Sequence, residues 1–197
     1  MRKLIILLAV ALLLMGGVSQ ASPLADFSCG RAAADLVWQL HTFEGDRAFA
    51  GGITVGLGDK WAIGYRQLDY DVNGSAGDWR TSNREINLIH KLDENIQLYA
   101  GYARTRGNGL HGSPDLAVKK VAQFGAILSK RLGDRTVAYA ILGGGDNLTS
   151  IEFGLSRQLN PGLELTVTYR HLTVEKVGSN RAKENYRGFG TGLTWKI

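Results

Sequence analysis

The chain has 197 residues, of which 44% are apolar and 21% are charged, and it carries a formal net charge of +5 at pH 7. This length suits one domain, and so small a positive charge gives no case for nucleic-acid binding. A single cysteine, Cys29, excludes an internal disulfide, and with it the class of small disulfide-stapled secreted domains.

The N-terminus has the features of a secretory signal peptide. Met1-Arg2-Lys3 precedes an apolar run over residues 4–15, and small residues follow at Ser19 and Ala21. The run is shorter than the ~20 apolar residues that span a bilayer. We therefore expect a signal peptide over 1–21, cleaved after Ala21, which would lower the formal net charge by two. Cys29 lies too far downstream for a lipoprotein.

From Ala32 onward, apolar and polar residues alternate with the period of β-strands, and no helical periodicity appears. Glycine is abundant, with 26 residues, whereas proline is scarce, with three. This composition favours strands that are broken by turns. We predict ten strands, at 32–43, 47–57, 60–72, 83–92, 95–106, 118–132, 135–142, 148–159, 162–174 and 187–197, preceded by a short periplasmic segment over 22–31.

Most predicted strands have one apolar face and one small or polar face. Phe124 stands on the apolar face of its strand, and we assign Tyr139 to the apolar face of the next strand, against Ala138 and Ala140. Leu68 and Tyr70 fall out of phase with the rest of their strand, which predicts a β-bulge there.

The predicted connections alternate in length. Tight turns are expected at 58–59, 93–94, 133–134 and 160–161, and longer links at 73–82, 107–117 and 175–183, with shorter ones at 44–46 and 143–147. Short turns at one end and longer loops at the other are typical of outer-membrane barrels, and an even strand number puts both termini on the periplasmic, short-turn side. A soluble up-and-down barrel is the alternative, with its apolar face inside.

Aromatic and charged residues separate these two alternatives. Amphipathic rings favour the membrane–water boundary, so we expect two aromatic girdles on the apolar face, made by Trp38, Trp61, Tyr65, Tyr102, Tyr139, Tyr169 and Trp195. The opposite face would place charges inside a membrane barrel, where they pair across a narrow lumen. These lumen charges are Asp35, Arg66, Glu85, Lys91, Glu152, Glu164 and Arg170.

The last segment, 187–197, alternates up to the final residue. Gly192, Trp195 and Ile197 resemble the C-terminal assembly signal of bacterial outer-membrane barrels, which more often ends in Phe. With the loop asymmetry and the signal peptide, the chain over 32–197 resembles the small up-and-down barrels grouped with OmpA and OmpX. The resemblance implies an all-β, antiparallel transmembrane barrel of about ten strands, eight being possible, in the outer membrane of a diderm bacterium.

The resemblance leaves the role open, because family members serve as structural or adhesive proteins, as narrow pores, or as lipid A-modifying enzymes. We expect a non-enzymatic structural or surface-interacting barrel with a largely plugged lumen. The enzymatic alternative has weak candidates in His171, Thr173 and Glu175, where the resemblance to the His-x-Ser-Asn motif of deacylase barrels is broken by Thr173 and Val174. A narrow channel is the third possibility.

Few ligands are expected. No compact His or carboxylate spacing points to a metal, and no motif points to a cofactor. The expected partners are outer-membrane lipid, lipopolysaccharide and the barrel-assembly machinery, and the protein is expected to be a monomer. Basic residues in the links at 73–82 and 175–183 could contact lipopolysaccharide phosphates or a host surface, although solvated loops explain them as well.

Overall fold

The computed structural model describes residues 22–42, 48–74, 77–110, 116–177 and 182–197. The described residues form ten β-strands. They are β1 Ala32–Thr42, β2 Ala48–Gly58, β3 Trp61–Gly74, β4 Gly77–Lys91, β5 Ile96–Leu110, β6 Leu116–Gly133, β7 Thr136–Gly145, β8 Leu148–Asn160, β9 Leu163–Val177 and β10 Ala182–Lys196. Within these ranges, no helix is long and apolar enough to cross a membrane.

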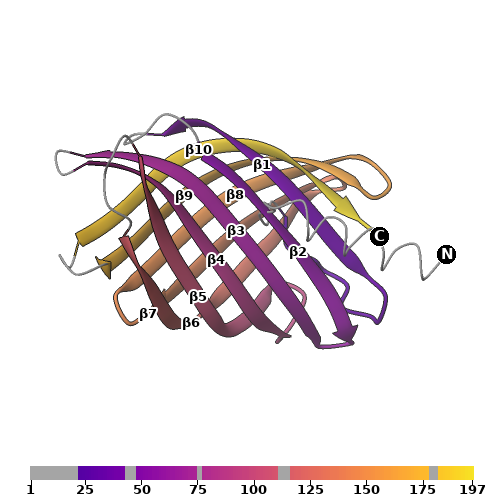
Figure 1. The fold of residues 1–197 in the computed structure, drawn as a ribbon. Coiled ribbons are helices and arrows are strands. Elements are labelled where there is room, and N and C mark those ends of the chain that lie inside the picture. The colour runs from indigo at the N-terminus through magenta and orange to yellow at the C-terminus, as the bar shows by residue number, and fades with distance from the viewer. Residues whose placement is uncertain (1–21, 43–47, 75–76, 111–115, 178–181) are drawn as a thin grey trace.

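Each strand pairs antiparallel with the next in sequence, and β1 pairs with β10 to close the barrel (Figure 1). At the seam, Ala32 and Ile197 exchange two backbone hydrogen bonds, of 3.1 and 2.9 Å. Closure leaves no sheet edge exposed, so every strand finds its backbone partners within the wall. The prediction of an all-β, up-and-down barrel of ten strands is confirmed.

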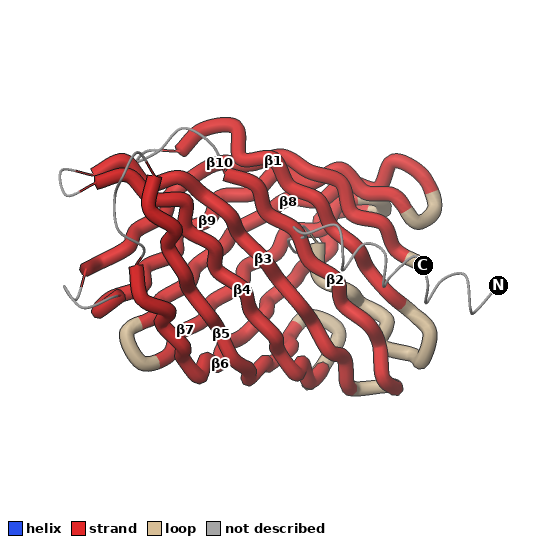
Figure 2. Tube along the Cα trace, in the orientation of Figure 1, coloured by secondary structure: helices blue, strands red, loops and turns tan. Residues whose placement is uncertain are grey.

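The two ends of the barrel differ. At the end that we call the turn end, short connections join β2 to β3, β4 to β5, β6 to β7 and β8 to β9, and both β1 and β10 reach this end (Figure 2). The β8–β9 connection is a Pro161-Gly162 turn, in which Gly162 has φ 87°, a value that favours glycine. We call the opposite end the loop end.

The long predicted links are largely strand. β3 runs to Gly74 and β4 starts at Gly77, where a link over 73–82 was predicted; β5, β6, β9 and β10 likewise extend into 107–117 and 175–183. Apolar and polar residues alternate only in the part of a strand where one face contacts lipid, inside the bilayer. Polar residues beyond that part still pair their backbones, and the sequence pattern does not reveal this pairing.

The barrel turns its apolar side chains outward and its polar side chains inward. Phe124 is 70% exposed and Trp38 is 62% exposed, whereas Glu85, Glu152 and Arg170 are buried inside. Contact between water and so much apolar surface is unfavourable, and soluble monomers therefore rarely expose a large contiguous apolar surface. The prediction of an apolar outer face therefore fits a bilayer better than a soluble barrel.

One detail of the predicted alternation is wrong. Leu68 and Tyr70 are not displaced by a bulge, because β3 keeps an unbroken register with β4 from Trp61 to Gly74 and with β2 through this region. Both side chains are buried in the lumen, in an apolar cluster toward the loop end. The lumen is therefore not polar throughout, which is why apolar residues appear on the expected polar face.

Candidate functional site

Four charged side chains meet in the middle of the lumen, and we call them the lumen quartet: Arg66, Glu85, Glu152 and Arg170. Arg66 is directly opposite Glu85 in the β3–β4 register, and Glu152 is directly opposite Arg170 in the β8–β9 register. Opposite charges on directly opposed residues favour strand pairing. Each wall therefore carries one acid and one base side by side.

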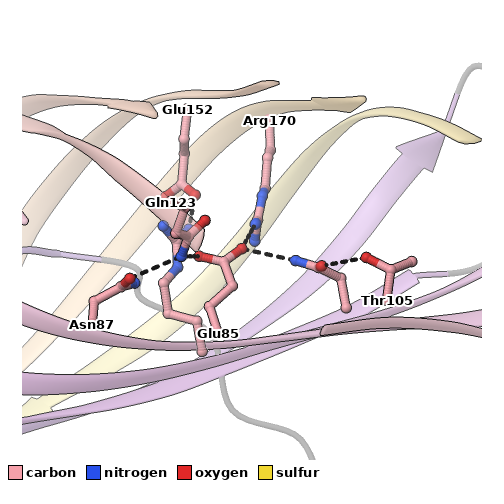
Figure 3. Close-up of polar contacts among 8 residues, drawn as sticks. Glu85, Asn87, Thr105, Gln123, Glu152 and Arg170 are labelled. Carbon is pink, nitrogen blue, oxygen red and sulfur yellow. Dashed lines mark hydrogen bonds and ion pairs between the residues drawn. The ribbon is translucent and has the colours of Figure 1, made fainter. Parts of the chain in front are cut away.

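The ion pairs of the quartet cross the lumen. Arg66 Nη2 donates to Glu152 Oε2, and Arg170 Nη2 donates to Glu85 Oε1 at 2.8 Å. In the closed ring, β8 is the fifth strand from β3 in either direction, so the pairs connect opposite walls (Figure 3). Glu85 and Arg170 are each only 2% exposed. Buried charges are costly unless they are paired, and each charge of the quartet has an oppositely charged partner. Arg66 Nε and the Nε and Nη1 atoms of Arg170 have no hydrogen-bond partner among the described residues.

Neutral polar side chains complete the coordination of Glu85. Asn83 Nδ2 donates to Glu85 Oε1 at 2.8 Å, and Gln123 Nε2 donates to Oε2 at 3.2 Å (Figure 3). Gln123 also donates to Asn87 Oδ1 at 2.8 Å, and the Thr105 hydroxyl donates to Asn83 Oδ1 at 2.8 Å. The carboxylate thus accepts hydrogen bonds from β4, β6 and β9, which ties these strands together.

The structure corrects the position of Tyr139. Its side chain is buried in the lumen instead of joining an outer aromatic girdle, and its hydroxyl donates to Glu152 Oε1 at 3.3 Å. The ring occupies the space above Gly154 on β8, where a Cβ would lie 2.2 Å from the tyrosine ring. The neighbours Ala138 and Ala140 consequently face outward, so the two faces of β7 are the reverse of those predicted.

Apolar layers lie above and below the quartet. Toward the loop end, the cluster includes Leu68, Leu172 and Tyr186; toward the turn end, another includes Ile89, Ile127 and Ile141. Side chains fill small barrels of about eight strands, and these layers do the same over much of this slightly wider one. The quartet is therefore enclosed between two apolar layers that reduce its contact with water.

The segment 22–31 lies against the inside of the turn end. Leu24 and Phe27 are buried in the turn-end apolar cluster, Gln97 Nε2 donates to the Leu24 carbonyl at 3.0 Å, and Lys91 Nζ donates to the Ala25 carbonyl at 2.8 Å. The Phe27 carbonyl also accepts a hydrogen bond from the Gly58 amide of β2 at 3.0 Å. The predicted short periplasmic segment is thus packed into the barrel mouth.

Hydrogen bonds inside this segment fix its shape. The Ser28 hydroxyl and backbone amide both donate to Asp26 Oδ1, at 2.7 and 3.0 Å, and Arg31 Nε donates to Asp26 Oδ2 at 3.0 Å. The bonds from Ser28, with the nearby Arg31, lower the pKa of Asp26 below its ordinary value. The ionised form of Asp26 is therefore the one that holds the segment.

The remaining predicted lumen charges have different surroundings. Glu164 accepts from Lys196 Nζ and from the Ser156 hydroxyl, both at 2.6 Å, near the turn end. Lys91 is at the mouth, against segment 22–31. Asp35 is buried on β1, in the cross-strand row that continues through Gly52 to Arg66. A cavity of about 690 Å³ at the mouth is lined in part by Lys91, Glu164 and Lys196.

Six of the seven predicted girdle residues are at least partly exposed on the outer surface. Trp61 and Trp195 lie at the turn end of β3 and β10, and Trp38, Tyr65, Tyr102 and Tyr169 lie farther toward the loop end. Trp195 and Ile197 of the predicted assembly signal also face outward, while Gly192 allows Val37 of β1 to approach closely at the seam.

The weak catalytic candidates only partly come together. His171 Nε2 is 3.2 Å from the Thr173 hydroxyl, but that hydroxyl donates to Asn185 Oδ1 at 2.9 Å. Glu175 forms an ion pair with Lys183 at 3.1 Å. An activated nucleophile would need its proton aimed at the histidine, and here the proton is engaged elsewhere.

Another histidine, His111 in the predicted link at 107–117, lies outside the described residues. Among the residues that are described, no group of three or more His, Cys, Asp or Glu side chains is placed to hold a metal ion. Cys29 is exposed, and its Sγ donates to the Leu57 carbonyl at 3.0 Å. The sequence did not reveal the asparagine and glutamine partners of Glu85, because neutral polar residues are unremarkable on a lumen face.

No protein-family model matches the chain, and no curated protein matches it in sequence. Solved structures with a similar fold include Ail of Yersinia pestis, with 12% identity, 86% of this chain and 99% of that chain covered, and a TM-score of 0.42. The N-terminal barrel of Pseudomonas aeruginosa OprF has 9% identity, covers 86% of this chain and 98% of its own, and has a TM-score of 0.39. Neisserial surface protein A has 13% identity, with coverage of 85% and 95% and a TM-score of 0.38. Similarities at this level give no argument about function.

Proposed function

We propose that this chain is a monomeric, non-enzymatic barrel of the bacterial outer membrane, exported by a signal peptide cleaved after Ala21, with a structural or surface-interacting role. The observation that carries the proposal is the inverted polarity of the wall, with Phe124 and Trp38 exposed outside and the ion-paired quartet buried inside. Strands spanning a bilayer need this arrangement, because lipid accepts apolar side chains and excludes unpaired charge.

The lumen of this barrel is closed to solutes in the proposed role. Three features support closure: ion pairs that cross from wall to wall, an apolar cluster on each side of them, and the packing of Leu24 and Phe27 at the mouth. An ion crossing the barrel would have to separate the quartet and also lose its hydration between the apolar layers, at a cost of several kcal/mol.

Fractionation and conductance test these two statements. The protein should remain in the outer-membrane pellet after carbonate extraction and should migrate faster on gels when it is not heated. Single-channel recordings in planar bilayers should show no regular conductance steps. Deleting residues 22–27 and replacing Arg66 and Glu152 with Ser should produce such steps; large steps from the native protein would contradict a closed lumen.

The non-enzymatic part has its own test. Lipid A from cells that express the native barrel should have the same mass spectrum as lipid A from cells expressing the His171→Ala variant and from cells with neither. A mass change that requires His171 would make the barrel an enzyme and overturn this part of the proposal, without affecting its location.

A further inference from the structure

Three basic side chains form a row across the outer surface of β4, β5 and β6. Arg84 lies directly opposite Arg104, and Arg104 lies directly opposite Lys120. All three side chains are exposed. Directly opposed like charges destabilise strand pairing, so this basic row costs stability when nothing else is bound.

No acid within the described part of the chain forms an ion pair with the basic row. The acidic side chains on the same outer face of β3 are already engaged: Asp71 accepts from Arg80 Nε at 3.0 Å, and Asp69 accepts from Gln67 Nε2 at 2.6 Å. Neither Arg84, Arg104 nor Lys120 has a carboxylate within ion-pair distance among the described residues. A negative group from outside the chain would relieve the repulsion.

The position of the basic row indicates where this negative group comes from. One row closer to the turn end, the same face carries Ile86, Tyr102 and Ala122 directly opposite one another, and Phe124 follows on β6. Two residues of strand span about 7 Å, so the basic row is the first polar row beyond the lipid-facing surface, on the loop side. Tyr102 is an aromatic residue of the kind found at membrane–water boundaries. Lipid headgroups occupy this level.

The surface beside the row is hollowed. A cavity of about 190 Å³ is lined by Ser82, Arg84, Arg104, Arg106 and Asn108. Arginine forks match phosphate oxygens in pairs, and the hydroxyl of Ser82 and the amide of Asn108 add neutral donors. The hollow therefore combines charge and hydrogen-bond donors suited to a phosphate monoester.

We propose that Arg84, Arg104 and Lys120, with this adjoining hollow, bind the phosphate groups of the outer-leaflet glycolipid, lipopolysaccharide, against the wall of the barrel. This inference rests on the proposed outer-membrane location. It predicts opposite effects of the basic row in two lipid environments: repulsion in neutral lipid, and attraction where a phosphorylated glycolipid is present.

The test uses the full mature barrel refolded into two kinds of vesicle, phosphatidylcholine alone and phosphatidylcholine with bisphosphorylated lipid A. The variant is R84Q/R104Q/K120Q. The matched control is K130Q/R135Q/R157Q, which removes the same charge from exposed positions near the turn end. We measure lipid A binding by titration, and the urea midpoint of unfolding in both vesicles.

The native barrel and the control should bind lipid A equally, and R84Q/R104Q/K120Q should bind it at least tenfold more weakly. In phosphatidylcholine alone, R84Q/R104Q/K120Q should unfold at a higher urea concentration than the native barrel, and in lipid A vesicles at a lower one. Equal binding by native barrel and variant, or equal weakening in the control, would overturn the assignment.

Two further arms separate other outcomes. Inorganic phosphate at about 10 mM, a concentration above the dissociation constant of a weak anion site, should not displace lipid A. Displacement would mean that the site binds free phosphate. A soluble heparin fragment that binds as tightly as lipid A, and is lost in the same variant, would make the row a general polyanion site and the lipid assignment wrong. Failure of the native barrel to insert into either vesicle would instead refute the proposed membrane function.

Discussion

Replacing Arg170 with methionine should strongly destabilise the barrel. The substitution keeps an unbranched side chain of similar length but removes the donor that lies 2.8 Å from Glu85 Oε1. Breaking a buried ion pair by deleting one partner typically costs ~3–5 kcal/mol, since the other charge is left uncompensated. Glu85 retains the amide donors of Asn83 and Gln123, and Arg66 remains directly opposite it. We therefore expect the lower end of that range, about 3 kcal/mol.

The assay is urea unfolding of the refolded barrel in phosphatidylcholine vesicles, followed by the fluorescence of the four tryptophans and by gel mobility. The comparison needs Glu85→Gln and the double variant as well. Removing both charges leaves neither partner stranded, so the double variant should be more stable than the sum of the single effects implies, with a coupling of ~0.5–3 kcal/mol. An Arg170→Met variant within about 0.5 kcal/mol of the native barrel, or a strictly additive double variant, would refute the reasoning.

Three other perturbations test separate parts of the structure. Phe124→Arg on the outer wall should cost ~2–4 kcal/mol in the same unfolding assay if Phe124 lies near the bilayer midplane, whereas Phe124→Leu should cost far less. Gly56→Val should release segment 22–31, because a Cβ at this position would lie 2.4 Å from the Phe27 carbonyl oxygen. Trypsin cleavage after Arg31, measured by mass spectrometry, should then increase. The control Val55→Ala, at a residue that faces outward, should leave this cleavage unchanged. The lowered pKa of Asp26 means that its contribution is present above the ordinary aspartate pKa of 3.8 and is lost as pH falls through the lower folded value. The stability difference between the native barrel and Asp26→Asn should thus shrink between about pH 5 and pH 2, and a difference independent of pH would contradict the role of the carboxylate.

The alternation of apolar and polar residues was enough to predict the strands of the barrel wall. Strands such as β6 and β8 place residues of different character on their two faces, for example Phe124 against Gln123 and Phe153 against Glu152, so period two identifies both the strand and its orientation. The ten strands and most of their bounds follow from this contrast and from the turn residues between them.

β7 lacked this contrast. Val137, Tyr139 and Ile141 alternate with Ala138 and Ala140, so both faces are apolar, and the pattern predicts that the larger side chains face lipid. The structure places Tyr139 and Ile141 inside, because the lumen near them is an apolar layer and because Gly154 leaves room for the tyrosine ring. Which face is lumenal depends on neighbours that are distant in sequence, and a single strand does not contain this information.

The packing of segment 22–31 into the barrel mouth also could not be predicted from the sequence. Its ten residues show no periodicity, and only the two large apolar residues, Leu24 and Phe27, indicate that it has a partner. Their partners, including Ile89 and Ile127, come from strands far along the chain. The direct ion pairing of Arg66 with Glu152 across the lumen depends in the same way on closure of the ring.

The two ion pairs of the quartet also constrain the order of folding. They join residues that are 86 and 85 positions apart in the sequence. Every strand pairing in the barrel wall except β1 with β10, in contrast, joins two strands that are consecutive in the sequence. Long-range contacts form after the local ones that reduce their entropic cost, so hairpins should assemble before Glu85 meets Arg170. During that interval each half of the barrel carries its own acid and base side by side, Arg66 with Glu85 and Glu152 with Arg170. Each half-barrel thus brings an acid and a base to this level before the halves meet, and the ion pairs that cross the lumen form only in the final sealing of the barrel.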